Sequence, residues 1–167
     1  MTHLVSAMLN QGGNRLVFAQ VAVQDKSNEI TAIPRLLELL DLSGAVVTID
    51  AMGCQRSIAR KIIEGGGDYV LALKENQETL YAKARTLLDE AALDGRGLIL
   101  DRHAETDAGH GRIETRKVWI TPEIEHLGES AEGFKGLAGV AKVESTREII
   151  GGKKSVESRY FLFSHQD

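Results

Sequence analysis

Two runs of apolar residues alternate with a helical pattern in the middle of the chain and predict the centre of the fold. Ala45 to Asp50 and Tyr69 to Leu73 are apolar and β-branched, which is typical of strands buried on both faces. Between them apolar residues recur at helical spacing, and Gly65-Gly66-Gly67 ends that pattern. Strand, helix and strand within about thirty residues predict a parallel crossover unit.

The residues before this unit predict a β-hairpin and a helix. His3 to Leu9 and Leu16 to Val23 read as strands, and they flank a turn at Gln11 to Asn14. A helical pattern opens at Lys26 and continues through Leu40. Because Pro34 is tolerated best in a first turn, we expect this helix to start late in that range.

An amphipathic helix at Glu78 to Leu93 and a β-rich region follow the crossover unit. The β-rich region predicts four strands in two hairpins, with a short helical turn at Pro122 to Leu127 between them: Leu98 to Thr106, Arg112 to Ile120, Leu137 to Ile149 and Val156 to Phe163. We therefore predict an α/β fold, divided into residues 1–95 and residues 96–167.

Polar residues follow the two central strands where each of them ends. Asp50 ends the first strand, at the edge where open α/β sheets place their chemistry, although it also suits the cap of the next helix. Lys74, Asn76 and Gln77 lie beyond the carboxyl end of the neighbouring strand. They suit a turn, and they also suit contacts with phosphates.

Charge is distributed unevenly along a chain whose net charge is −4. Residues 52–88 hold six basic and four acidic side chains, and residues 135–160 hold six and three. A basic face is therefore compatible with an acidic total. Arg112, Glu114 and Arg116 alternate along one predicted strand, so they share a face that is either solvated or in contact with DNA.

The cysteine and histidine content excludes several kinds of site. A single cysteine rules out an internal disulfide and fits a reducing cytoplasm. Apolar runs are also too short for a membrane span, since none approaches the ~20 residues that a span needs. Cys54 lies between a strand end and a helix, where its pKa could fall, but it has no His close in sequence and suits packing better than nucleophilic attack. The five His and one Cys show no zinc spacing.

Four motifs occur in order along the chain and together resemble a known family. They are Lys26 to Ile30 (KSNEI), Val47 to Gln55 (VTIDAMGCQ), Tyr69 to Lys74 (YVLALK) with Asn76-Gln77, and His110 to Arg116 (HGRIETR). In this combination the sequence resembles bacterial insertion-sequence transposases of the ISAs type, also called H-repeat-associated proteins. The resemblance covers essentially all 167 residues.

The resemblance implies an RNase H-like catalytic fold, a mixed sheet with flanking helices, with a DDE active site. In that family three carboxylates hold two divalent ions, Mg²⁺ or Mn²⁺, which activate the attacking hydroxyl and stabilise the leaving oxygen of a DNA phosphodiester. Asp50 matches the middle Asp, as catalytic residue and metal ligand. Residues 1–95 would form part of the catalytic core, and residues 96–167 a β-rich insertion. DNA is the implied partner, with Lys74, Asn76, Gln77, Arg112 and Arg116 as candidate contacts, and a homo-oligomer is left open.

The sequence departs from the family pattern in its other two carboxylates. The first family Asp lies on a strand before the one at His3 to Leu9, and the third carboxylate lies on a helix after the insertion. Glu114 falls inside the insertion and is no natural substitute. We therefore expect a central fragment of a transposase, incomplete at both ends and inactive alone.

Two other classes of function compete with this one. The chain could be a catalytically dead remnant that binds DNA or associates with other subunits. A hydrolase with Asp50 as nucleophile is disfavoured, because such phosphatases want a second Asp two residues later, where this chain has Met52.

Overall fold

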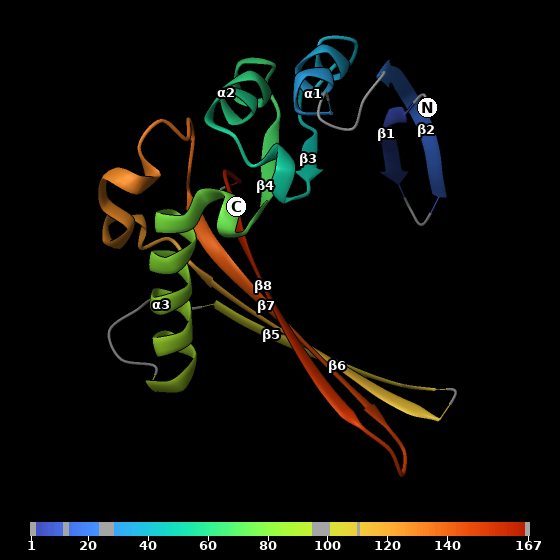
Figure 1. The fold of residues 1–167 in the computed structure, drawn as a ribbon, viewed down its shortest axis with the longest axis vertical. Coiled ribbons are helices and arrows are strands. Elements are labelled where there is room, and N and C mark those ends of the chain that lie inside the picture. Colours follow the sequence, from blue (N-terminus) through green and yellow to red (C-terminus); the bar gives the residue numbers. More distant parts are fainter. Residues whose placement is uncertain (1–2, 12–13, 24–28, 95–100, 110, 166–167) are drawn as a thin grey trace.

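The computed structural model describes residues 3–11, 14–23, 29–94, 101–109 and 111–165 (Figure 1). The strands are β1 (His3–Gln11), β2 (Asn14–Val23), β3 (Val46–Ile49), β4 (Asp68–Leu73), β5 (Asp101–Gly109), β6 (Arg112–Thr121), β7 (Gly139–Ile149) and β8 (Lys154–Phe163). The α-helices are α1 (Glu29–Leu37), α2 (Arg56–Glu64) and α3 (Glu78–Asp94), and the 3₁₀ segments are η2 (Ala51–Gly53), η3 (Glu75–Gln77) and η4 (Ile124–Ala131). Within these ranges, every helix is too short or too polar to cross a membrane.

Six strands form one mixed sheet in the order β3-β4-β8-β7-β6-β5. β3 and β4 are parallel and are joined through α2, which confirms the predicted crossover unit. The other neighbours are antiparallel, and β8 pairs with β4 from Val70↔Phe163 to Leu73↔Tyr160. The α/β class is confirmed, whereas a separate β-rich insertion is not, because β8 of the predicted insertion bonds directly to β4 of the predicted core. The division at residue 95 stays a prediction.

The three glycines after α2 end the helix as predicted. Gly66 has φ of 78°, and the Gly67 N–H donates to the Ile62 carbonyl over 3.1 Å, which is the bonding pattern of a Schellman cap. A Cβ at Gly67 would lie 2.8 Å from the Leu42 carbonyl oxygen. These constraints turn the chain directly from α2 into β4.

The hairpin of β1 and β2 forms a second sheet, and α1 packs against both strands. No other strand of the described residues bonds to β1. The helix prediction was wrong at two points. α1 ends at Leu37 rather than Leu40, because Leu39 and Leu40 bond at the tighter i→i−3 spacing. Pro34 lies in the helix interior rather than in its first turn.

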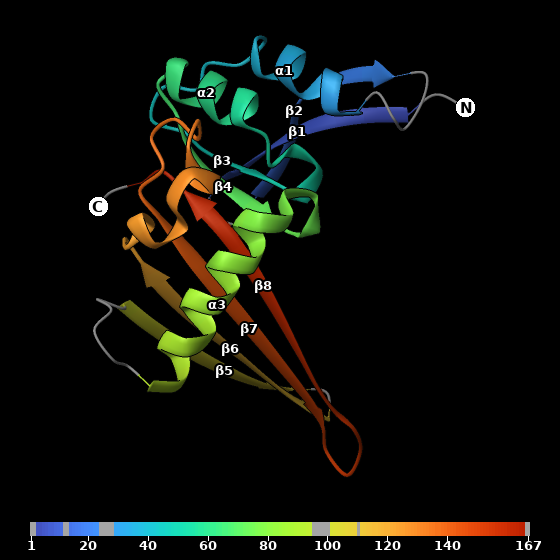
Figure 2. The ribbon, with the colours of Figure 1, turned by 60° about the vertical axis from the view of Figure 1, so that its left-hand side comes forward.

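The core lies between one face of the six-stranded sheet and α2, α3 and η4, and α1 packs beside α2, over the β1–β2 hairpin (Figure 2). Along β4 the residues alternate, with Tyr69, Leu71 and Leu73 buried against α2 and α3 while Val70 and Ala72 are half-buried on the opposite face. Away from α3, the strands β5 to β8 continue as an exposed ribbon that projects beyond the helices (Figure 1).

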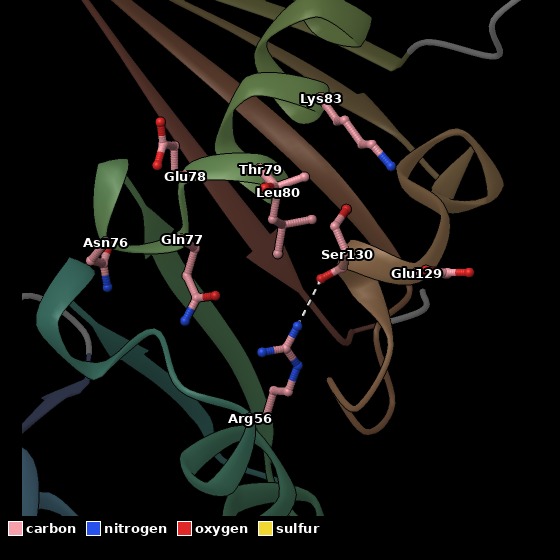
Figure 3. Close-up of a pocket in the computed structure, with 9 residues that line it drawn as sticks. All are labelled: Arg56, Asn76, Gln77, Glu78, Thr79, Leu80, Lys83, Glu129 and Ser130. Atoms are coloured by element: carbon pink, nitrogen blue, oxygen red, sulfur yellow. Dashed lines mark hydrogen bonds between the residues drawn. The ribbon is translucent and has the colours of Figure 1, made fainter.

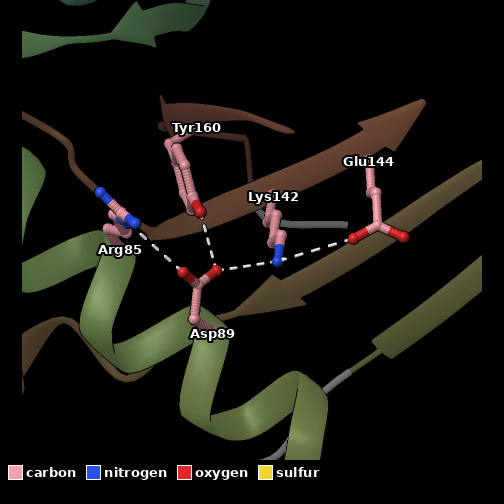
Figure 4. Close-up of polar contacts among 5 residues, drawn as sticks. All are labelled: Arg85, Asp89, Lys142, Glu144 and Tyr160. Carbon is pink, nitrogen blue, oxygen red and sulfur yellow. Dashed lines mark hydrogen bonds and ion pairs between the residues drawn. The ribbon is translucent and has the colours of Figure 1, made fainter. Parts of the chain in front are cut away.

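A polar cluster joins α3 to the sheet (Figure 4). The buried Lys142 Nζ donates to Asp89 Oδ1 over 2.8 Å, and the Tyr160 hydroxyl donates to the same oxygen over 2.7 Å. Lys142 also lies 5.4 Å from the centre of the Trp119 ring. Burial alone would raise the pKa of Asp89, but the bonds from Lys142 and Tyr160 outweigh it and hold that pKa below its ordinary value. The carboxylate is therefore a charged anchor for α3.

Two tyrosines on this face provide a matched test of that anchor. Tyr160→Phe removes the hydroxyl donor from a charged acceptor and should destabilise the chain by about 1.5–3 kcal/mol. The Tyr69 hydroxyl is buried with no hydrogen-bond partner among the described residues, so Tyr69→Phe should be neutral or stabilising. Urea unfolding followed by circular dichroism measures both, and equal destabilisation by the two variants would show that the bond to Asp89 contributes nothing.

Candidate functional site

Asp50 lies at the carboxyl edge of the parallel pair of strands. It follows β3 directly, and the register Ile49↔Leu71 places the end of β4 at the same edge. Asp50 occupies the N-cap position of η2, but among the described residues its carboxylate makes no capping hydrogen bond, and the residue is exposed. The backbone carbonyl of Asp50 instead accepts the Gly53 N–H over 3.0 Å. The carboxylate therefore remains open to solvent.

Side-chain amides from η3 hold the loop that follows Asp50. Asn76 Nδ2 donates to the Ala51 carbonyl over 2.6 Å, and Gln77 Nε2 donates to the Cys54 carbonyl over 3.0 Å. Lys74 is exposed and occupies the N-cap position of η3. The structure thus brings Lys74, Asn76 and Gln77 to the edge of Asp50, as predicted, and shows that both amides position the loop.

Two small residues let this loop fold back over the end of β3. A Cβ added to Gly53 would lie 2.2 Å from Ile49 Cγ2, so the close approach requires glycine. Cys54 is fully buried, and burial raises the pKa of its thiol to about 12. Cys54 is therefore an inert packing residue, as predicted. The role of Gly53 was missed, although a glycine in the turn that follows a strand is a signal for close backbone approach.

A pocket of about 450 Å³ opens beside this loop (Figure 3). Its walls come from the start of α2, from η3, from the first turns of α3 and from η4, and its lining residues are Arg56, Asn76, Gln77, Glu78, Thr79, Leu80, Lys83, Glu129 and Ser130. Sequence reasoning missed Arg56 and Lys83 because nothing in the pattern predicted that η4 would close over α3.

Arg112 and Arg116 lie on the ribbon, away from this edge. They share one face of β6, as predicted, and Arg112 Nε is 3.0 Å from Glu114 Oε1 while Arg116 Nη1 is 3.7 Å from Glu105 Oε1. Across the sheet, Leu73 of β4 pairs with Tyr160 of β8, and the same row of paired residues reaches β6 at Trp119. Trp119 and Arg112 are seven residues apart, so at ~3.3 Å per residue about 23 Å of strand separates Arg112 from this row. Arg112 is therefore not brought together with Lys74, Asn76 and Gln77, whereas Arg116 lies three residues, or about 10 Å of strand, from Trp119.

The described residues offer few ligands for a metal ion. Nowhere in the described part of the chain do three or more His, Cys, Asp or Glu side chains gather in a group that could hold one. Two-metal phosphoryl-transfer sites need several carboxylates around the ions. Asp50 alone does not fit such a pair, so the described residues do not form a two-metal centre by themselves.

The amide bonds to the Asp50 loop can be tested separately from any activity. Asn76→Ala and Gln77→Ala each remove a side-chain donor from a loop carbonyl, and each should cost about 1 kcal/mol of stability. Both should also speed hydrogen exchange at Cys54, whose N–H bonds to the Ala51 carbonyl. Glu75→Ala, an exposed change in the same segment, is the control. Exchange rates that match this control in both variants would mean that the amides do not hold the loop.

Comparison with known proteins adds the family. Residues 3–126 match the family described as transposase DDE domain. The chain is 46% identical over 156 residues to an uncharacterized protein in the dhlA 3′ region of Xanthobacter autotrophicus, which covers 90% of this chain and 50% of that protein. It is 36% identical over 165 residues to the H repeat-associated putative transposase YhhI of Escherichia coli strain K12, which covers 97% of this chain and 43% of that protein.

A third relative is the YbfD protein of the same strain, also named as H repeat-associated, which is 42% identical over 114 residues. That match covers 68% of this chain and 44% of YbfD. The chain spans about half the length, or less, of these relatives. No solved structure matches it. Because the family match takes in most of the sequence and contains Asp50 with its whole loop, the chain belongs to the transposase DDE domain family.

Proposed function

We propose that this chain supplies part of an RNase H-like DDE active site that cleaves and joins DNA in the transposition of an insertion sequence. The observation that carries the proposal is Asp50, an exposed residue directly after β3, at the start of a loop held by Asn76 and Gln77. A catalytic ligand has to be accessible yet held in place, and this arrangement provides both.

Metal binding by the complete site needs carboxylates in addition to Asp50. In the proposal Asp50 is the middle ligand for two divalent ions, Mg²⁺ or Mn²⁺, and the other carboxylates come from outside the described residues. The chain alone is then inactive in cleavage and strand transfer. In the same proposal residues 1–95 form part of the catalytic core and residues 96–167 the region that follows it.

DNA is the proposed partner, and a second candidate function uses DNA binding alone. The exposed ribbon with Arg112 and Arg116 favours a remnant that binds DNA or associates with further subunits without catalysis. In both candidates Lys74 contacts a phosphate at the Asp50 edge, and Asn76 and Gln77 act chiefly by holding the loop. The two candidates differ in whether Asp50 is needed for a reaction.

A chimera tests the catalytic role of Asp50. The region of YhhI that matches this chain would be replaced by residues 1–167, and Mg²⁺-dependent cleavage and joining of element ends would be measured. We expect activity in the chimera and a loss of at least about 100-fold in Asp50→Asn, because the amide lacks the anionic charge that a metal ligand needs. Glu75→Gln removes a charge from the neighbouring segment and should leave activity within about twofold. An active Asp50→Asn chimera would refute the proposal.

Salt titration of DNA binding by the chain itself tests the predicted contacts. Lys74→Ala should reduce the slope of log K against log salt by about one, since one phosphate contact is lost. Arg112→Ala/Arg116→Ala should reduce the slope by about two if the ribbon also contacts phosphates. Fluorescence anisotropy with a labelled duplex provides the measurement. An unchanged slope in the double variant would assign both arginines to the ion pairs with Glu114 and Glu105 alone.

A further inference from the structure

The pocket beside the Asp50 loop holds two cations that the proposed function does not use. Arg56 begins α2 and Lys83 lies on α3, and both line the pocket. Neither forms an ion pair with a carboxylate of the described residues, in contrast to Lys61, Lys135 and Lys142. Their positive charge is therefore available to a ligand.

Both cations are held in place by neutral groups. Arg56 Nε donates to the Glu132 carbonyl over 2.6 Å, and Nη2 donates to the Ser130 carbonyl over 3.1 Å. The guanidinium also lies 5.3 Å from the centre of the Phe134 ring. Lys83 Nζ donates to the Leu127 carbonyl over 2.9 Å. Carbonyl oxygens orient these heads without cancelling their charge, so a bound anion would not have to order them.

The remaining lining suits an anion whose oxygens accept several hydrogen bonds, such as a phosphate. Thr79 adds a hydroxyl donor, and Gln77 keeps one amide hydrogen besides the one that it donates to the Cys54 carbonyl, whereas the Ser130 hydroxyl donates to the Leu127 carbonyl. Phosphate oxygens accept from guanidinium, ammonium, amide and hydroxyl donors. Glu78 and Glu129 also line the pocket, but Figure 3 shows both carboxylates turned away from the space between Arg56 and Leu80. Their charge at the rim weakens anion binding without blocking it.

We infer that this pocket binds one backbone phosphate of a nucleic-acid strand that passes Asp50, with Arg56 and Lys83 as the binding residues. The inference rests on the proposed function, because DNA is what brings the phosphate. Gln77 connects the two places, since it lines the pocket and also bonds to the loop after Asp50. A strand anchored in the pocket is thereby aligned along the edge that presents Asp50.

The test is binding of the full chain to a labelled duplex and to a labelled single strand, by anisotropy over a range of salt. Arg56→Gln and Lys83→Gln should each weaken binding about 5- to 10-fold at low salt and each reduce the salt slope by about one. Arg60→Gln is the matched control, because Arg60 is an exposed cation on the same helix outside the pocket lining. It should change affinity by less than about twofold.

A variant that strengthens binding guards against simple loss of folding. Arg56 also bonds to the η4 region, so its removal could loosen that segment. Glu129→Gln removes a rim carboxylate and should raise affinity about two- to threefold, which a misfolded chain cannot produce. Arg56→Lys keeps the charge and should retain most of the salt slope. Thermal unfolding of each variant would be recorded alongside.

Three results would overturn the inference: no DNA binding by the parent chain, equal effects of Arg56→Gln and Arg60→Gln, or no gain from Glu129→Gln. An inorganic phosphate arm separates the sources of the anion. If binding of free phosphate depends on Arg56 while the salt slope of oligonucleotide binding does not, the pocket is a small-anion site and the inference fails. The activity of the chimera is measured independently of these outcomes. If that activity depends on Asp50 while Arg56→Gln and Lys83→Gln do not affect DNA binding, the phosphate pocket is refuted and the proposed function is not.

Discussion

The pairing of β4 on both of its edges is the constraint on which the arrangement of this chain depends. One edge is parallel to β3, which requires α2 as a crossover, and the other is antiparallel to β8, which comes about ninety residues later. Ser164 extends the pairing of β8 with β4, because its hydroxyl accepts the Tyr69 N–H over 2.8 Å and donates to Asp68 Oδ1 over 2.8 Å. The Asp50 edge and the ribbon are parts of one sheet only through β4.

The hydrogen bonds to Asp89 affect which way the first turns of α3 face. Burying Lys142 carries a desolvation cost, which Asp89, Tyr160 and the Trp119 ring offset through close contacts. These hydrogen bonds act together with the buried side chains of α3, which include Leu80, Ala84, Leu88 and Ala91, to fix the rotation of the helix on the sheet. Because α3 is thereby fixed in rotation, its first turns present Thr79 and Lys83 to the pocket rather than to the sheet.

Local pattern predicted the elements of this fold better than it predicted their partners. The crossover unit follows from β-branched runs and the glycines at 65–67, and Asp50 could be named because chemistry gathers where such strands end. The pairing of β8 with β4 could not be foreseen, since alternation along a strand carries no information about a partner far away in sequence. For the same reason the separation of Arg112 from Asp50 emerged only from the register of the ribbon.

Asn76 and Gln77 were predicted at the correct edge, but an amide suits a carbonyl of the chain as well as it suits a phosphate. Arg56 and Lys83 looked like solvated helix residues because their partners are backbone carbonyls in and after η4, which no pattern of side chains reveals.

A net charge of −4 does not argue against DNA at the Asp50 edge, because distance and screening decide which charges a phosphate meets. Asp89 lies six residues along α3 from Lys83, which at ~1.5 Å per residue is about 9 Å, close to the screening length of ~10 Å at 0.1 M salt. Asp89 contributes little to the pocket because its carboxylate is already paired with Lys142. Arg56 and Lys83 lie in the pocket wall itself, with their charge unpaired within the described residues. In the proposed complex these cations and the rim glutamates would therefore set the affinity for a phosphate, and the acidic remainder of the chain would act mainly on the rate of encounter at low salt.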